Sequence, residues 1–84
     1  MAPDWICEIL SPSTARIDRA VKMPIYARND VPHLWLVDPD VRTLEVYRLQ
    51  DDARWLLFAT LKEDDAVRQP PFEAVEFLLG ALWA

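Results

Sequence analysis

The sequence predicts an α/β domain with a mixed sheet, and three observations support this fold class. An apolar segment over residues 4–10 precedes a helical pattern over residues 14–29, and a second apolar segment follows at residues 33–38. Two short strands joined by a helix are typical of a parallel pair with a right-handed crossover. Two further strand-like segments follow at residues 43–49 and at about 54–61, and a polar turn at residues 50–53 joins them as in an antiparallel pair. We therefore expect a strand–helix–strand unit followed by an antiparallel meander, in one domain over residues 1–84.

Composition restricts the class of protein. The chain has 84 residues, of which 52% are hydrophobic and 27% charged, so it can form the core of one small domain. Its apolar runs are only a few residues long, which excludes a transmembrane helix, and its N-terminus lacks the basic start of a secretory signal. Cys7 is the single cysteine, which excludes a disulfide framework and a zinc cluster and fits a cytoplasmic protein.

The net charge of −5 argues against a protein that coats nucleic acid through a broad basic surface. It leaves room for a local basic face, because four basic residues cluster in the helical segment. Such a cluster is more often the solvent-exposed side of a helix. The four residues are Arg16, Arg19, Lys22 and Arg28.

The first strand carries one acid, Glu8, in an otherwise apolar segment. Both of its faces are largely apolar, so we expect a central strand covered on both sides, with Cys7 buried. A carboxylate in such a strand must be paired with a base or bind a cation. Residues 11–14 then end the strand, and Ser13 or Thr14 is a suitable helix N-cap.

The helix has a mostly apolar stripe and a polar stripe. We expect the apolar stripe to dock on the sheet, with the polar stripe beside it. Pro24 falls inside the helix, where its ring would clash with the carbonyl of Ala20, so we expect a kink or a break beside Lys22. The apolar stripe contains Ile17, Ala20, Val21, Pro24, Ile25 and Arg28, and the polar stripe contains Asp18, Lys22 and Tyr26.

Further strands and a helical turn complete the expected fold. His33–Asp38 forms a buried strand, and Pro39-Asp40 makes the turn into an antiparallel strand at Thr43–Leu49. The next strand runs from about Arg54 to Leu61. Near the C-terminus we expect a short strand at Ala74–Phe77 and a final helical turn.

Glu8 and Lys22 are the residues most suited to chemistry. Glu8 either pairs with Lys22 or a helix arginine, or it binds a hard divalent cation such as Mg²⁺, and spacing alone leaves both open. Lys22 could neutralise charge on a phosphate, and the simpler alternative is an exposed helix lysine. Tyr26 could hydrogen-bond the same site or cover the edge of the core. The strand–helix path predicts that Glu8 and Lys22 lie on one side of the domain, within hydrogen-bond or one-water reach.

A metal site needs a second acid, and Asp4 is the nearest candidate along the chain. Asp4 and Glu8 share a strand face, yet their α-carbons lie about 13 Å apart, which hardly allows both to hold one Mg²⁺. Asp38 precedes a proline and is better suited to forming a turn. We identify no acid on a different strand. His33, the only histidine, begins a strand, where a structural role is the commoner one.

Several linked segments resemble the Uma-two family, which is described as putative restriction endonucleases of bacteria. The resemblance implies the PD-(D/E)XK nuclease superfamily, with a restriction-endonuclease-like core, Mg²⁺ as cofactor and DNA as substrate. It runs through residues 3–14, then Asp18, Lys22 and Tyr26, then residues 31–39, and continues through Thr43–Leu49.

The resemblance also implies roles for individual residues. Glu8 is similar to the acid of the (D/E)XK element and is the expected metal ligand. Leu10 stands where that element has its lysine, so Lys22 resembles a lysine that has moved to the following helix. Glu8 and Lys22 are therefore the expected catalytic pair, with Asp4, Asp18 and Tyr26 as possible supporting residues.

The resemblance is to the C-terminal half of the family domain. The first half of that domain supplies a helix, earlier strands and another acid on a neighbouring strand, and we expect this part of the fold to be missing here. Without that neighbour, the strand at residues 4–10 has a free apolar edge. An edge of this kind can pair with a second chain, so we expect a homodimer through antiparallel pairing of residues 4–10.

Two classes of function follow. The first is a Mg²⁺-dependent DNA endonuclease, or a truncated and inactive member of that family. We expect weak or no cleavage by this chain alone, because one strand carboxylate holds Mg²⁺ poorly. The alternative is a non-catalytic interaction or remnant module that self-associates. A shift of the NMR signals of Glu8 and Lys22 on adding Mg²⁺ separates the two classes.

Overall fold

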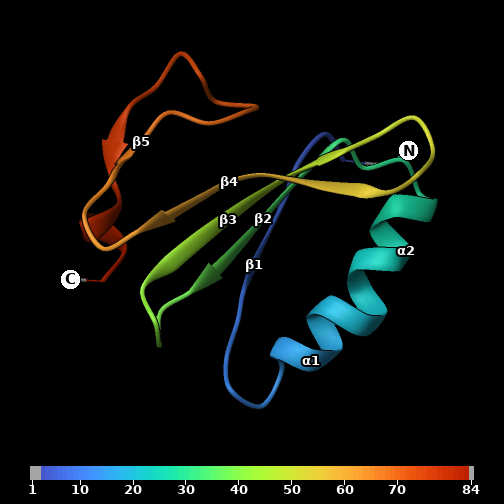
Figure 1. Cartoon of the computed structure of the whole chain (residues 1–84), viewed down its shortest axis with the longest axis horizontal. Coiled ribbons are helices and arrows are strands. Elements are labelled where there is room, and N and C mark those ends of the chain that lie inside the picture. The colour runs from blue at the N-terminus through green and yellow to red at the C-terminus, as the bar shows by residue number, and fades with distance from the viewer. Residues whose placement is uncertain (1–2, 84) are drawn as a thin grey trace.

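The computed structural model describes residues 3–83, and its main element is a four-stranded sheet (Figure 1). The strands lie in the order β1 (Ile6–Ile9), β2 (His33–Asp38), β3 (Thr43–Leu49) and β4 (Trp55–Lys62). β1 pairs with β2 in parallel, whereas β2 with β3 and β3 with β4 are antiparallel. The mixed sheet and the antiparallel meander predicted from the sequence are therefore confirmed.

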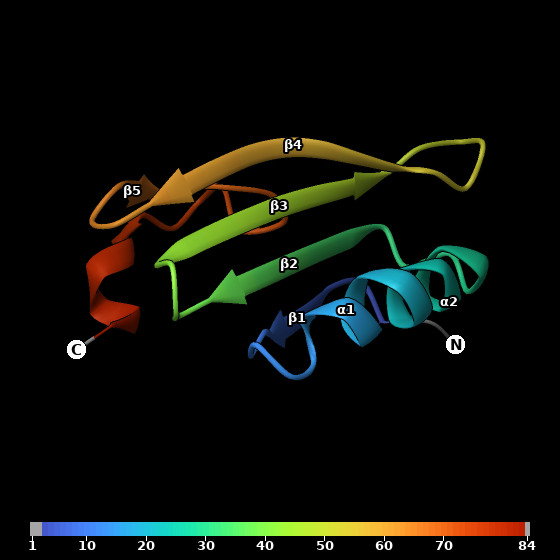
Figure 2. The same cartoon turned by 60° about the horizontal axis from the view of Figure 1, so that its bottom comes forward.

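One helix connects β1 to β2 and lies on one face of the sheet (Figure 2). It consists of α1 (Ala15–Ile17), a π-helical turn η1 (Asp18–Lys22) and α2 (Met23–Arg28). The helix predicted over residues 14–29 thus agrees with the structure to within one residue at each end. No helix within residues 3–83 is long and apolar enough to cross a membrane.

The π-helical turn lies directly before the segment that contains Pro24. The backbone N–H of Met23 donates to the carbonyl of Asp18, five residues earlier. In a regular α-helix the Pro24 ring would crowd the carbonyl of Ala20, and Pro24 has no N–H to donate. A widened turn relieves this crowding. The expected kink or break beside Lys22 is therefore a change of helix type within a continuous helix.

The C-terminal segment forms a second, smaller unit against the other face of the sheet. β5 (Ala66–Val67) pairs antiparallel with β6 (Phe77–Leu78), and a 3-10 turn η2 (Leu79–Leu82) follows. The expected strand at residues 74–77 overlaps β6 by one residue, and the final helical turn is confirmed. The short β5 strand was not predicted.

The alternation of side chains along β2 divides the core into two layers. Leu34 and Leu36 are buried on the helix side, where Leu10 packs with them. Trp35 and Val37 point to the opposite face, where buried side chains of β3, β4 and the C-terminal segment cover them. These are Leu44, Val46, Leu61, Val67 and Leu79.

The prediction that the first strand is central and covered on both sides is wrong for the described residues. β1 pairs only with β2 within residues 3–83 and lies at the edge of the sheet. Cys7 is exposed, and Ile9 is 69% exposed, so the prediction of a buried Cys7 is also wrong. Apolar side chains on both faces favour burial on both sides, yet the described residues place no strand beside β1 on its outer edge.

The helix is oriented opposite to the prediction. Its apolar stripe is exposed, with Ile17 and Val21 each 51% and Ile25 39% accessible. Its polar stripe faces the sheet instead, and Asp18 is only 2% exposed. The face that docks combines the polar partners of Glu8 with Ala15 and Met23, which pack against the buried leucines of the sheet.

Candidate active site

Glu8 lies in the middle of β1 and points to the face that the helix covers. Its side chain is 21% exposed, and one of its oxygens, Oε1, accepts a hydrogen bond from the Tyr26 hydroxyl. The Lys22 ammonium lies 3.6 Å from the other oxygen, Oε2. The predicted proximity of Glu8 and Lys22 is therefore confirmed, while their catalytic roles stay a prediction.

Lys22 bridges two carboxylates. Its Nζ lies 3.0 Å from Oδ1 of Asp18, which is one helical turn earlier, in addition to its contact with Glu8. Asp18 Oδ1 is buried, and within residues 3–83 the Lys22 ammonium is the group that compensates its charge. The contact with Asp18, followed by the charge of Glu8, raises the pKa of Lys22. Lys22 is therefore a fixed positive charge at neutral pH.

Tyr26 completes this group. Burial and then its hydrogen bond to Glu8 raise the pKa of Tyr26 to about 12. The hydroxyl is therefore neutral at physiological pH and acts as a donor to Glu8. Glu8, Lys22, Asp18 and Tyr26, which the sequence placed on one strand and one helix stripe, are brought together by the structure.

A second polar group on the same face was missed by the sequence analysis. Glu45 on β3 accepts from Arg19, whose Nη2 lies 2.7 Å from Oε1, and from the Tyr47 hydroxyl at 3.1 Å. Arg19 Nη1 also donates to the Tyr47 hydroxyl at 3.4 Å. Strand register aligns Glu45 with Leu36, and Leu36 with Glu8, so both acids point to the helix side.

The sequence contained a signal for this second acid. In Thr43–Leu49, buried Leu44 and Val46 alternate with Glu45 and Tyr47, which places the latter two on the other face. Their closeness to Glu8 depends on how three strands align, which the local pattern does not give.

Asp4 lies apart from the group. It is exposed before β1, and the structure gives it no hydrogen bond or ion pair with another residue in 3–83. Asp38 has the predicted turn role, because its Oδ1 accepts from the backbone N–H of Asp40 at 3.0 Å and of Val41 at 3.4 Å. Neither acid adds a ligand near Glu8.

The residues around Glu8 do not make a complete set of metal ligands within residues 3–83. No group of three or more His, Cys, Asp or Glu side chains within residues 3–83 is arranged to hold a metal. Glu8 supplies the hard oxygen atoms that Mg²⁺ prefers, but Tyr26 and Lys22 contact these oxygens. The buried Oδ1 of Asp18 is likewise taken up by Lys22, at 3.0 Å.

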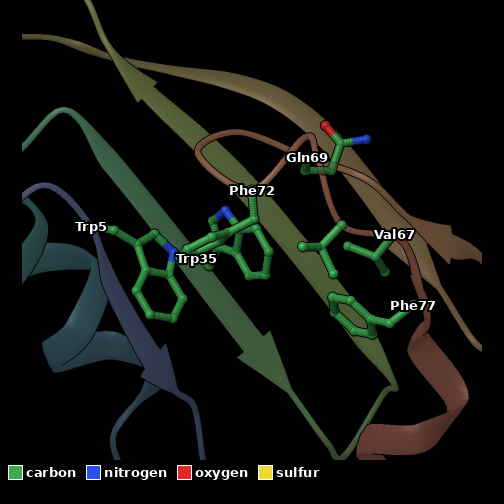
Figure 3. A pocket seen from close by; sticks show the side chains of 7 residues that line it. Trp5, Trp35, Val67, Gln69, Phe72 and Phe77 are labelled. Carbon is green, nitrogen blue, oxygen red and sulfur yellow. The ribbon is translucent and has the colours of Figure 1, made fainter.

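A cavity of about 260 Å³ lies on the opposite face of the sheet (Figure 3). Its aromatic wall is formed by Trp5, Trp35 and Phe72, with ring centroids 4.9–5.7 Å apart in edge-to-face pairs. The Trp35 indole N–H donates to the carbonyl of Pro70 at 2.8 Å. Among residues 3–83, no ionisable side chain lines this cavity. The remaining lining residues are Val67, Gln69, Val75 and Phe77.

Comparison with known proteins assigns the family. The sequence profile of Uma2, described as a putative restriction endonuclease, matches residues 1–80. The chain belongs to the Uma2 family. The Uma2 chain also matches the crystal structure of a putative nuclease belonging to DUF820 from Anabaena variabilis ATCC 29413, with a TM-score of 0.71 and 29% identity. A search of curated proteins found no match.

The match to the Anabaena nuclease covers 99% of the Uma2 chain and 45% of the other chain. The Uma2 chain therefore spans less than half the length of that protein. The nuclease-like fold and the family resemblance predicted from the sequence are confirmed.

Proposed function

We propose that this Uma2 chain is part of a Mg²⁺-dependent DNA endonuclease. The observation that carries the proposal is the contact of Lys22 with Glu8 and Asp18 on one face of a nuclease-like fold. A carboxylate beside a fixed cation suits phosphodiester hydrolysis, in which negative charge develops on the phosphate.

Each residue of the group has a distinct role in this proposal. Glu8 contributes one carboxylate to the Mg²⁺ site, where the metal would withdraw charge from the phosphate. Lys22 faces the scissile phosphate and stabilises its developing charge. Asp18 positions the Lys22 ammonium from the side of the helix, and Tyr26 fixes the orientation of Glu8. Asp4 has no part in it.

The chain corresponds, in this proposal, to the C-terminal half of a restriction-endonuclease-like domain. Its match to 45% of the Anabaena chain and the free edge of β1 support this correspondence. The remaining metal ligand would come from a strand next to β1. We therefore expect weak or no cleavage by the chain alone. We also propose that the protein is cytoplasmic.

A homodimer is the second candidate, and it corresponds to a non-catalytic module that self-associates. The free edge of β1 and the 69% exposure of Ile9 favour it. Antiparallel pairing of two β1 strands about a two-fold axis would cover both the free edge and the Ile9 side chain.

Cleavage of supercoiled plasmid with Mg²⁺ tests the nuclease proposal. We expect nicking by the chain alone to be slow or absent. Any Mg²⁺-dependent nicking should fall about 100-fold in Lys22→Met, as it does on loss of a charge-stabilising group, and should be abolished in Glu8→Gln. Glu76→Gln removes an exposed acid and serves as the matched control. Nicking that survives both Glu8→Gln and Lys22→Met would place the activity elsewhere.

A further inference from the structure

The sheet face below the helix carries two polar groups, each with a glutamate, a tyrosine and a basic residue. In the first, Glu8 contacts a tyrosine hydroxyl and Lys22. In the second, Glu45 contacts a tyrosine hydroxyl and Arg19. The buried Leu36 separates the two glutamates, which occupy the same row of three neighbouring strands. Neighbouring strands lie about 4.8 Å apart, so the two glutamate α-carbons are about 10 Å apart.

In both groups the cation lies outside the carboxylate. The side chains of Arg19 and Lys22 are 42% and 43% exposed, whereas those of Glu45 and Glu8 are 23% and 21% exposed. A polyanion that approaches from solvent therefore meets the two cations before the acids. Both cations come from the π-helical turn Asp18–Lys22, so they follow one another along the same edge of the helix.

Arg19 keeps donors free while it is held in place. A guanidinium carries five N–H donors, and Glu45 and Tyr47 contact only Nη2 and Nη1. The structure shows no hydrogen bond from Arg19 Nε within residues 3–83. Arginine with a fixed guanidinium and free N–H groups is well suited to a phosphate oxygen, which it can bind at two points.

We propose that Arg19 binds a second phosphate of the DNA strand, next to the phosphate at Lys22, and that Glu45 and Tyr47 are positioning residues for its guanidinium. This inference rests on the proposed nuclease function. An ion pair that only ties the helix to β3 is the competing explanation. It would affect stability and leave DNA binding unchanged.

Salt-dependent binding of a fluorescent DNA duplex, with Ca²⁺ in place of Mg²⁺, separates these explanations. We expect Arg19→Gln to weaken binding and to lower the slope of log K against log salt by about 1, which is the loss of one phosphate contact. Arg28→Gln removes the same charge from an exposed site on the same helix and should leave the slope unchanged. Arg19→Lys keeps the charge and should keep the slope, with weaker binding.

The variant Glu45→Gln tests whether Glu45 positions the Arg19 guanidinium or whether the charge of Arg19 alone attracts the phosphate. It leaves the Arg19 charge in place, so the slope should stay at the wild-type value while affinity falls because the guanidinium is no longer held. Equal slopes for Arg19→Gln and Arg28→Gln would overturn the assignment of Arg19 and leave the nuclease proposal standing.

Pyrophosphate serves as a probe that does not depend on DNA. We expect it to shift the NMR signal of the Arg19 Nε–H in the wild-type chain and not in Glu45→Gln at the same concentration. A shift together with no DNA binding would support the anion site and contradict DNA as its ligand. No shift and no slope change would overturn the Arg19 site altogether.

Discussion

Asp18 is the charged side chain that the fold buries most deeply among the described residues, at 2% exposure. Burial of an ionised carboxylate is unfavourable unless a partner compensates it, and Lys22 at 3.0 Å is that partner. Lys22 in turn reaches Glu8. One lysine therefore ties the stability of the helix–sheet contact to the geometry of the candidate site.

A double-mutant cycle tests this role of Asp18. We expect Lys22→Met to lower the free energy of unfolding, because an unpartnered buried acceptor costs about 1–3 kcal/mol. Asp18→Asn combined with Lys22→Met should recover part of that loss, because the orphaned charge is gone. Urea unfolding of Lys22→Met, Asp18→Asn and the double variant measures both effects. Additive losses in the double variant would contradict the coupling.

The Tyr26 hydroxyl gives a pH-dependent prediction. Its pKa is raised to about 12, so the folded state holds the proton more tightly than the unfolded state. The resulting stability is fully present below pH 10 and is lost as the pH rises toward 12. In a Tyr47→Phe background, absorbance at alkaline pH should show Tyr26 titrating near 12, and Glu8→Ala should lower that midpoint. A midpoint at the ordinary value near 10 would contradict the buried hydrogen bond.

The sequence predicted the polar group around Glu8 better than the group around Glu45. Glu8, Lys22 and Tyr26 are connected by a short strand–helix path, so their spacing along the chain limits their positions. Glu45 reaches the same face only through the alignment of β1, β2 and β3, which involves residues far apart in the sequence.

At the scale of elements, the helix shows what periodicity leaves open. The spacing of apolar residues predicted both stripes, and a periodic pattern normally places the apolar one against the core. Here Asp18 faces the sheet and Val21 is 51% exposed. The docked face carries the polar partners of Glu8 together with Ala15 and Met23, which pack on the sheet. The π-helical turn before Pro24 is likewise a local response that residue spacing alone does not give.

The orientation of the helix predicts a contrast between two substitutions. Val21→Gln should change the free energy of unfolding by less than about 0.5 kcal/mol, because the side chain lies at the surface. Leu36→Ala should cost about 2–5 kcal/mol, because Leu36 is 1% exposed under the helix. Chemical unfolding measures both. A loss of several kcal/mol for Val21→Gln would mean that the apolar stripe docks on the sheet after all.

At the scale of the whole molecule, the sheet ends at β1 in the described chain. The sequence predicted the strand order through the crossover and the meander, since those connections are short. The apolar character of residues 4–10 indicated two covered faces. The described residues cover the face of β1 that lies under the helix, while Cys7 and Ile9 remain exposed on its opposite face.

Self-association through β1 predicts a concentration-dependent dimer. We expect sedimentation equilibrium to detect dimers at high micromolar concentration, because pairing satisfies the open backbone groups of the edge. Ile9→Lys should shift the equilibrium toward monomer, since a charge on an edge strand opposes pairing. Val41→Lys, at an exposed valine away from β1, is the control. A stable monomer at these concentrations would contradict the dimer.

A Mg²⁺ titration followed by NMR tests most directly whether Glu8 and Lys22 act together at a metal-dependent site. We predict that the side-chain carboxyl signal of Glu8 and the Nζ signal of Lys22 shift together with one binding curve. In Glu8→Gln, the Lys22 signal should stay unchanged over the same range. Shifts confined to exposed acids such as Asp51 and Asp52, with Glu8 and Lys22 unmoved, would contradict the claim.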